Sequence, residues 1–324
     1  MPSEVPGAGA VMVIGGAEDK LRNKVILHRF IELAGGDQAR IVVISTASSL
    51  GEAATDLYRQ LFTQIGATHV SGLRPLTREE ANDPAMSEAI DDATGIFLTG
   101  GNQLRLSSVV GGTRLGASIL AAHERGVVVA GTSAGASAVS THMVAFGASG
   151  ATPKHRMVQI SAGLGLLKGV VVDQHFEQRT RLGRLLAVVA QSPSLVGLGL
   201  DEDTAAIVQA DQSLEVIGKG AVTIVDGSQV VTDAFDTKGY RPMMVSGAIL
   251  HSLPAGQRFD LTARRLLSPA HAALEKPEKK DRPARTRAPA EVRRLAREIA
   301  IEGVDSLALE RQRRRAGTQR EASE

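Results

Sequence analysis

Strand-like and helix-like segments alternate along the first half of the chain. A continuous run of Val, Ile or Leu is typical of a strand that is covered on both faces, and strands that alternate with amphipathic helices are typical of a parallel sheet. The strand-like runs lie at residues 10–14, 40–45, 95–98 and 127–130, and the helix-like segments at 21–34, 52–65 and 113–125. We therefore predict an α/β fold with a doubly wound, mostly parallel sheet and helices on both faces.

The turns after the strands are the expected place for a site, because ligands of such sheets bind outside the carboxyl ends of the strands. Gly15-Gly16, residues 100–103, Ser133 and residues 173–175 each follow an apolar run, so we expect all four turns to meet at one edge of one sheet. Gly15-Gly16 does not continue as G-x-G-x-x-G, and no phosphate-loop pattern is present. We therefore expect no nucleotide cofactor, and no cofactor of another kind.

Ser133 is the candidate nucleophile. Residues 131–135 read Gly-Thr-Ser-Ala-Gly directly after a buried-type strand. A sharp strand-to-helix turn needs glycine on both sides, since a Cβ atom there would collide with the neighbouring chain while the serine hydroxyl is exposed above the sheet. The pentapeptide alone also occurs in chains without catalytic activity, so the prediction depends on the partners of the serine.

A serine hydroxyl needs a base, and the base needs an acid that orients it. Of the eight histidines, His175 lies directly after an apolar strand, which the parallel-sheet interpretation places at the same edge as Ser133. Glu202 follows the next apolar strand, with Asp201 and Asp203 as competing acids. The backbone N–H groups of Ala134 and of Gly100 or Gly101 are the candidate oxyanion donors. The chemistry favoured is acyl transfer to water without a metal.

Three arginines follow His175. They are Arg179, Arg181 and Arg184, and the last two are three residues apart on a predicted helix surface. This cluster has two possible interpretations. Guanidinium groups bind carboxylates in a bidentate manner, which favours a substrate clamp. A solvated basic face is the other interpretation, and the arginines alone do not separate the two.

The composition of the 324 residues limits the possible classes of protein. With 43% hydrophobic residues the chain can bury a large core, and with 3% aromatic residues it is poor in the stacking platforms that bind nucleic acids. The absence of cysteine excludes disulfides, thiolate metal sites and cysteine nucleophiles. Without a signal peptide or an apolar run of ~20 residues, we expect a soluble cytoplasmic protein that does not enter a membrane.

The composition changes after Leu274, where charged residues and prolines replace large apolar ones. We therefore predict an α/β domain at residues 1–274 and a charged, disordered tail at 275–324. In the tail, Val292, Leu295, Ala296 and Ile299 have the spacing of a short amphipathic helix. The tail carries more Lys and Arg than Asp and Glu, and its arginines at 311 and 313–315 could contact RNA, another anionic surface or the acidic face of the protein itself.

Five motifs in this order resemble the cyanophycinases, serine peptidases of the S51 family, over about residues 10–274. The motifs are Gly15-Gly-Ala-Glu-Asp-Lys20, Thr99-Gly-Gly-Asn-Gln103, Gly131-Thr-Ser-Ala-Gly-Ala136, Asp173-Gln-His175 with the arginines after it, and Asp201-Glu-Asp-Thr204. The resemblance implies a flavodoxin-like fold related to the glutamine amidotransferase domain, a homodimer, and a triad of Ser133, His175 and Glu202. It also implies a substrate, cyanophycin, whose polyaspartate backbone carries arginine on each β-carboxyl and is cleaved to β-Asp-Arg dipeptides.

The resemblance assigns the lining of the substrate pocket as well. The implied substrate-binding residues are Gln103, Asp173, Gln174, Arg179, Arg181 and Arg184. The chain order serine, histidine, acid differs from the α/β-hydrolases, in which the acid precedes the histidine. The tail after Leu274 is a departure from the family pattern.

Three alternatives stay open. The first is a related dipeptidase that acts on aspartyl dipeptides with the same triad. The second is a binding protein for Asp- or Arg-rich peptides that has lost catalysis, and the third is an α/β-hydrolase esterase that pairs Ser133 with a later histidine such as His251.

Overall fold

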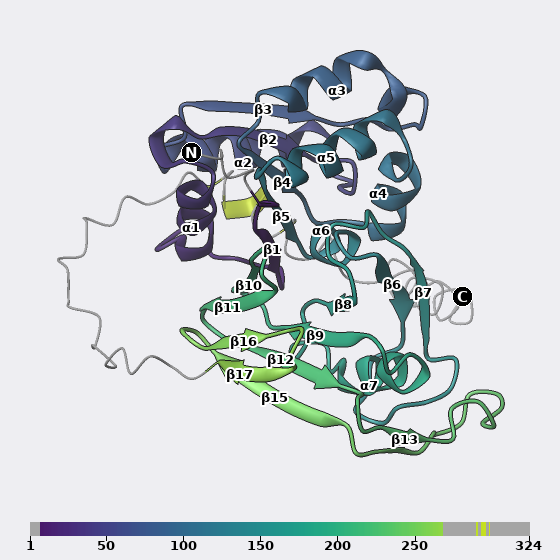
Figure 1. Cartoon of the computed structure of the whole chain (residues 1–324). Coiled ribbons are helices and arrows are strands. Elements are labelled where there is room, and N and C mark those ends of the chain that lie inside the picture. Colours follow the sequence, from purple (N-terminus) through teal and green to yellow (C-terminus); the bar gives the residue numbers. More distant parts are fainter. Residues whose placement is uncertain (1–6, 268–289, 291–292, 296–297, 299–324) are drawn as a thin grey trace, which may run out of the picture.

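A computed structural model describes residues 7–267 together with 290, 293–295 and 298 (Figure 1). The predicted linker after Leu274 and the basic residues 311–315 lie outside the described residues. Of the predicted tail helix, Ala290, residues 293–295 and Glu298 are helical, and Leu295 packs against the core. No helix among the described residues is long and apolar enough to cross a bilayer.

The largest sheet has nine strands, of which one half is parallel and the other half antiparallel. The parallel half runs in the order β3 (His69–Leu73), β2 (Arg40–Ile44), β4 (Gly95–Leu98), β5 (Val128–Thr132) and β1 (Val11–Ile14). The antiparallel half continues from β1 through β10 (Thr204–Val208), β11 (Ser213–Gly218), β16 (Arg258–Asp260) and β17 (Arg265–Leu267). The structure is therefore mixed α/β, and the strands predicted at residues 10–14, 40–45, 95–98 and 127–130 are all present in its parallel half.

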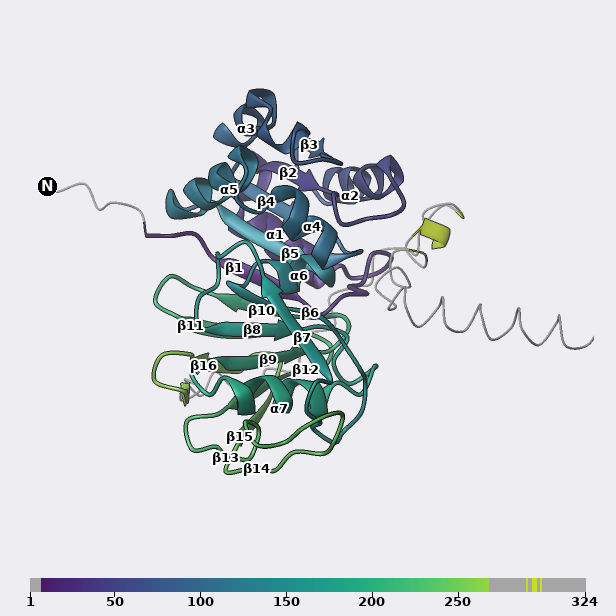
Figure 2. The same ribbon diagram turned by 90° about the vertical axis from the view of Figure 1, so that its right-hand side faces the viewer.

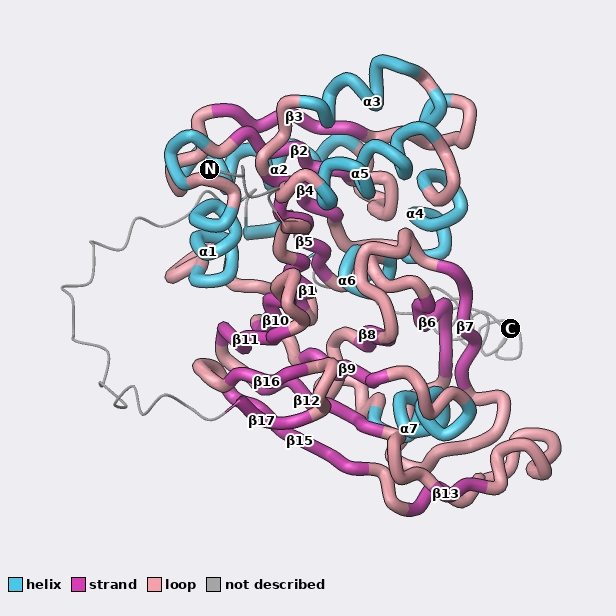
Figure 3. The backbone as a smooth tube through the Cα atoms, viewed as in Figure 1, coloured by secondary structure: helices cyan, strands magenta, loops and turns pink. Residues whose placement is uncertain are grey.

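Helices cover both faces of the parallel half, as the alternating sequence predicts (Figures 1 and 3). Successive residues of β1 point to opposite faces: Met12 and Ile14 join one apolar cluster, and Val11 and Val13 join another. On the first face lie α1 (Val25–Leu33) and α2 (Glu52–Gln64); on the second lie α3 (Pro84–Asp91), α4 (Gln103–Val110), α5 (Arg114–Glu124) and α6 (Ala134–Ala138). Short 3₁₀ turns lie at Gly36–Gln38 and Glu80–Asn82.

A second sheet of four strands corrects one expectation from the sequence. The sequence predicts that the apolar strands before His175 and Glu202 lie in the same sheet as the strand before Ser133. In the structure these strands form a separate sheet beside the nine-stranded one (Figure 2). Its order is β15 (Ile249–Pro254), β12 (Ala221–Asp226), β9 (Val196–Leu200) and β8 (Val170–Asp173), and α7 (Leu182–Gln191) packs against it. The physical reason is that antiparallel β10 occupies the free side of β1, so β8 cannot extend the first sheet.

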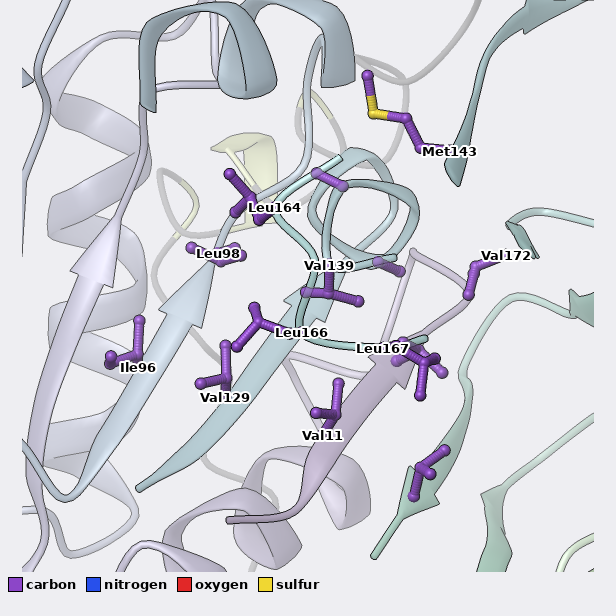
Figure 4. Packing of buried hydrophobic residues seen from close by; sticks show 14 of the residues in the cluster. Val11, Ile96, Leu98, Val129, Val139, Met143, Leu164, Leu166, Leu167 and Val172 are labelled. Carbon is purple, nitrogen blue, oxygen red and sulfur yellow. The ribbon is translucent and has the colours of Figure 1, made fainter. Parts of the chain in front are cut away.

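One apolar cluster joins the two sheets. Figure 4 shows Val11 and Val129 of the first sheet facing Leu166 and Leu167, with Val172 of β8 in the same cluster. Two small hairpins complete the fold, β6 (His142–Gly147) with β7 (Val158–Ala162) and β13 (Val231–Thr232) with β14 (Val245–Ser246). Continuous packing through this cluster fixes the carboxyl ends of β8 and β9 relative to those of β1 and β5.

Candidate active site

Ser133 lies at the turn between β5 and α6. Its backbone has φ 50° and ψ −111°, a conformation that costs a non-glycine residue roughly 1–3 kcal/mol. A Cβ atom on Gly131 would lie 2.4 Å from the carbonyl carbon of Gly135, and one on Gly135 would lie 2.4 Å from the carbonyl oxygen of Leu98. The two glycines are therefore required by the close approach of the backbone, as the Gly-Thr-Ser-Ala-Gly pattern predicts.

His175 follows β8 and contacts both the end of β1 and the serine. Its backbone N–H donates to the carbonyl of Gly15 at 2.9 Å. The imidazole packs against Gly16, where a Cβ atom would lie 2.4 Å from Cε1 of the ring. Nε2 lies 2.9 Å from Oγ of Ser133, and the side chain is 1% exposed. The imidazole is thus held between the loop after β1 and the serine turn.

Glu202 follows β9 and completes the chain of hydrogen bonds. Its Oε1 lies 2.7 Å from Nδ1 of His175. The backbone N–H of Glu202 donates to the side-chain oxygen of Gln178 at 2.9 Å, which anchors the acid to the turn after His175. With a proton on Nδ1 directed at Glu202, Nε2 is the acceptor for the serine hydroxyl.

The two competing acids beside Glu202 have other contacts. Asp201 accepts the backbone N–H groups of Glu177 and Ala221 at 3.2 and 3.0 Å. Asp203 accepts the backbone N–H of Asp19 at 2.8 Å. Both carboxylates tie loops together, and the carboxylate that reaches His175 is that of Glu202.

Burial and neighbouring charges set the protonation of this pair. Burial lowers the pKa of the His175 imidazole below its usual value, the charges of Arg179 and Arg181 act in the same direction, and Glu202 opposes them. The hydrogen bond from His175 lowers the pKa of Glu202 against the effect of its partial burial. At neutral pH the pair is therefore a neutral imidazole beside a carboxylate, the state in which Nε2 can accept a proton.

The candidate oxyanion donors lie on either side of Ser133. Ala134 is the first residue of α6, so its N–H has no acceptor within the helix. The Gly100-Gly101 turn lies beside the serine, since a Cβ atom on Gly100 would be 3.3 Å from that of Ser133. Gly101 has φ 133° and packs so closely on the carbonyl of Ala47 that a Cβ atom would lie 2.1 Å from its oxygen.

Arg181 and Arg184 are buried, which rules out the solvated basic face as the interpretation of these two arginines. Arg181 precedes α7, and each side chain is 3% exposed. The Nε of Arg184 donates to Oδ2 of Asp173 at 2.6 Å, and its Nη2 donates to Oδ1. Arg181 Nη1 donates to the backbone and side-chain oxygens of Gln174 at 2.5 and 2.6 Å, and lies 3.3 Å from Oδ1 of Asp173. A carboxylate that is fully buried, as that of Asp173 is, requires such cationic partners.

Arg179 and Gln103 differ from these buried arginines. Arg179 lies in the turn after His175, is half-buried, and acts electrostatically on both His175 and Glu202. The amide nitrogen of Gln103, at the start of α4, donates to the carbonyls of Val144 and Ala145 at 3.2 and 2.6 Å. Of the three arginines, Arg179 is thus the one beside the triad that solvent reaches.

Glu18 is a residue whose place the sequence reasoning missed. It lies 3% exposed behind the serine turn and accepts hydrogen bonds from Tyr58 at 2.5 Å and from Thr132 at 2.7 Å. Lys20, also buried, lies 2.8 Å from its Oε1. A signal was present in the sequence, because opposite charges two residues apart follow a buried strand within the Gly15–Lys20 motif.

His251 lies on β15 with its ring 4.8 Å from that of Phe259, whereas the hydrogen bond of the Ser133 hydroxyl goes to His175. No group of three His, Cys, Asp or Glu side chains within the described residues could hold a metal ion.

Residues 11–217 match the model of Peptidase family S51. The chain belongs to this family. Among S51 relatives, cyanophycinases from Nostoc sp. and Geminocystis herdmanii are each 41% identical to it, covering 81% and 78% of this chain and 89% and 93% of theirs. The crystal structure of a peptidase from an acI-B1 Actinobacterium matches with a TM-score of 0.58 and 24% identity over 78% of this chain and 97% of that one, which is a likeness of fold. This S51 chain is therefore a peptidase.

Proposed function

We propose that this S51 peptidase is a serine exopeptidase that hydrolyses cyanophycin and releases β-Asp-Arg dipeptides through an acyl-enzyme. The chemistry rests on one observation, the hydrogen-bonded series from Ser133 Oγ through His175 to Glu202, with distances of 2.9 and 2.7 Å. The substrate rests on the relatives named cyanophycinase, which are 39–41% identical over 78–81% of this chain.

In the acylation step, Oγ of Ser133 forms a bond to the carbonyl carbon of the scissile backbone amide while Nε2 of His175 takes the hydroxyl proton. Glu202 holds the imidazole in the tautomer that can accept this proton and stabilises the imidazolium that forms. The oxyanion receives hydrogen bonds from the N–H groups of Ala134 and Gly101, a contribution of typically ~2.7–4 kcal/mol per donor. The C–N bond then breaks, and the leaving amine takes the proton from Nε2.

Deacylation repeats the same steps with water. His175 removes a proton from a water molecule, the hydroxide adds to the ester carbonyl, and Ser133 leaves with the proton that Nε2 returns. The lowered pKa of His175 keeps the imidazole neutral and able to accept a proton at the start of each half-reaction.

Substrate binding is assigned to the residues that border the triad. Arg179 is half-buried beside His175 and Glu202, which suits a guanidinium that binds the free carboxylate of a substrate arginine, since the β-carboxyls of the polyaspartate backbone are amide-linked to arginine. The buried set of Asp173, Gln174, Arg181 and Arg184 supports the segment that carries Arg179, and Gln103 on α4 is proposed as a further binding residue. The proposed binding region thus combines a half-buried guanidinium with a rigid charged support.

The finer fold class and the dimer belong to the same proposal. The four strands β3-β2-β4-β5 lie in the order of the first four strands across a flavodoxin-like sheet, and β1 lies next to β5 as the fifth parallel strand. This order supports a fold related to the glutamine amidotransferase domain. The homodimer stays a prediction, which light scattering of the purified chain tests.

Replacement of Ser133 by alanine tests the function. We expect Ser133→Ala to lower the release of β-Asp-Arg from insoluble cyanophycin by a factor on the order of 10⁴ or more, with an unchanged melting temperature. A folded Ser133→Ala protein with the activity of the wild type would overturn the proposal. Small Asp-X dipeptides, assayed in parallel, distinguish a cyanophycinase from an aspartyl dipeptidase, because the latter would prefer the dipeptides.

A further inference from the structure

The loop after β1 contacts all three elements that carry the proposed triad. The carbonyl of Ile14 accepts the N–H of Ser133 at 3.0 Å, and that of Gly15 accepts the N–H of His175 at 2.9 Å. The carbonyl of Gly16 accepts the N–H of Asp203, next to Glu202, at 2.9 Å. Three successive carbonyls therefore fix the nucleophile, the base and the loop of the acid.

Glu18 extends this loop beneath the serine turn. Its Oε2 accepts the hydroxyl of Thr132 at 2.7 Å, and its Oε1 accepts that of Tyr58 at 2.5 Å. Burial alone would raise the pKa of this carboxyl, but Lys20, Tyr58 and Thr132 together lower it to about 2. Glu18 is thus a permanently charged acceptor inside the protein.

Thr132 is the residue through which Glu18 can act on the nucleophile. It pairs with Ile14 in the parallel ladder of β1 and β5, and it directly precedes Ser133. The strained backbone of Ser133 persists only where neighbouring groups hold it. On the side of β1 those groups are the carbonyl of Ile14, through the Ser133 N–H, and the carboxylate of Glu18, through the Thr132 hydroxyl.

Lys20 compensates the negative charge of Glu18 beneath the serine turn. An uncompensated negative charge behind Ser133 would oppose the charge that forms on the substrate oxygen. The Nζ atom of Lys20 lies 2.8 Å from Oε1 of Glu18 and 5.5 Å from the centroid of the Tyr58 ring. The pair is electrically neutral as a unit, so it can provide a strong acceptor without an unfavourable net charge.

We propose that Glu18 is a positioning residue, which holds Ser133 Oγ within reach of His175 through the Thr132 hydroxyl. This proposal rests on the proposed role of Ser133 as nucleophile. The hydroxyl of Thr132 and the carboxylate of Glu18 bond to each other, so the proposal gives neither group a contact with the substrate. Their effect therefore falls on kcat and on the reactivity of Ser133, and KM stays unchanged.

The test compares substitutions of nearly equal shape. Thr132→Val removes only the hydroxyl, and Thr132→Ser keeps it. Thr55→Val is the matched control, because Thr55 is a buried threonine whose hydroxyl lies 2.6 Å from Ser45, away from Glu18. Each variant is assayed for kcat and KM on cyanophycin, for the rate at which a serine-directed fluorophosphonate labels Ser133, and for melting temperature.

We expect Thr132→Val to lower kcat and the labelling rate about tenfold to hundredfold, as for the loss of a hydrogen bond to a charged acceptor. Thr132→Ser should restore both, and Thr55→Val should change only the melting temperature. Equal kcat and labelling in Thr132→Val and the wild type would overturn the proposal. If Thr132→Val does not fold, Thr132→Ala replaces it, because it also removes the hydroxyl that Glu18 accepts, and unchanged kcat and labelling in that variant would have the same meaning.

Labelling of the wild type separates this proposal from the proposed function. A wild-type Ser133 that reacts with the fluorophosphonate while cyanophycin is not cleaved would contradict the substrate but leave the positioning test intact. A wild-type Ser133 that is never labelled would contradict the nucleophile, and with it the positioning role of Glu18.

Discussion

The two sheets contribute to the proposed triad in different ways. The nine-stranded sheet supplies Ser133, whose position is set locally by the close approach of Gly131 and Gly135 to the backbone. The four-stranded sheet supplies His175 and Glu202. Across the junction, the carbonyls of Gly15 and Gly16 accept the N–H groups of His175 and of Asp203, the residue after Glu202. The nucleophile is therefore fixed by contacts within the first sheet and the loop after β1, while the base and acid depend on how the two sheets meet.

This difference matters because a triad works only at hydrogen-bond distance. A shift of the second sheet by one ångström would leave the Ser133 turn intact and still separate Oγ from Nε2. The apolar cluster that contains Val11, Val129 and Val172 resists such a shift, and the backbone bonds from Gly15 and Gly16 fix the final register. Changes at the junction should therefore affect catalysis more than changes of equal size elsewhere.

The largest expected effect is on kcat, and it distinguishes two histidines carried by the four-stranded sheet, His175 and His251. His175→Ala removes the proposed base, and we expect kcat to fall by a factor on the order of 10⁴ or more. His251→Ala, on β15, removes a half-buried ring that packs on Phe259 and should cost stability but little activity. Steady-state kinetics with melting curves measure both, and the reverse pattern would assign the base to His251.

The next effect compares ion pairs of the two sheets. Arg184→Met leaves the buried carboxylate of Asp173 with less cationic compensation, and we expect a loss of about 3 kcal/mol in the free energy of unfolding. Arg40→Met, at the exposed pair with Asp92 in the first sheet, should cost under about 1 kcal/mol. Urea titrations of both variants test this, and equal losses would show that burial is not the cause.

A smaller effect concerns the junction itself. Gly16→Ala places a Cβ atom 2.4 Å from the ring of His175, so the imidazole must move, and we expect kcat to fall about 100-fold. Gly36→Ala is the matched control: its φ is also positive, at 66°, but no atom lies within 4 Å of the added Cβ. The control should lose about 1 kcal/mol of stability and no activity. A Gly16→Ala enzyme with the kcat of the Gly36→Ala control would show that the junction tolerates movement.

The same comparison explains which parts the sequence predicts. The strands and helices of the parallel half, and the glycine turn at Ser133, follow from patterns within a few residues. The separate second sheet does not, because the apolar runs before His175 and Glu202 look like those of a central strand. Their place is decided by β10, which arrives from far along the chain to occupy the free side of β1.

The contacts of the buried charged residues do not follow from local sequence either. Arg181 and Arg184 have helical spacing, and nothing local shows that Asp173 is fully buried and binds both of them. The positions of His175 and Glu202 after apolar strands did indicate that they meet Ser133, although the reason given, a common sheet, was wrong. Glu18 had no predicted role because its partners, Tyr58 and Thr132, lie 40 and 114 residues away.

The smallest expected effect is a shift in the pH at which kcat/KM declines on the acid side, here called the acid limb. Charged residues beside His175 cause this shift. His175 must be neutral to accept a proton, and its pKa lies below the usual value of about 6.5. As pH falls, kcat/KM should therefore stay constant past about pH 6.5 and decline only at lower pH. Glu202 raises this pKa and Arg179 lowers it. Arg179→Gln should therefore move the limb to higher pH. Arg179→Lys keeps the charge and should leave the limb in place. A limb that stays in place or moves to lower pH in Arg179→Gln would mean that it reports a group other than His175.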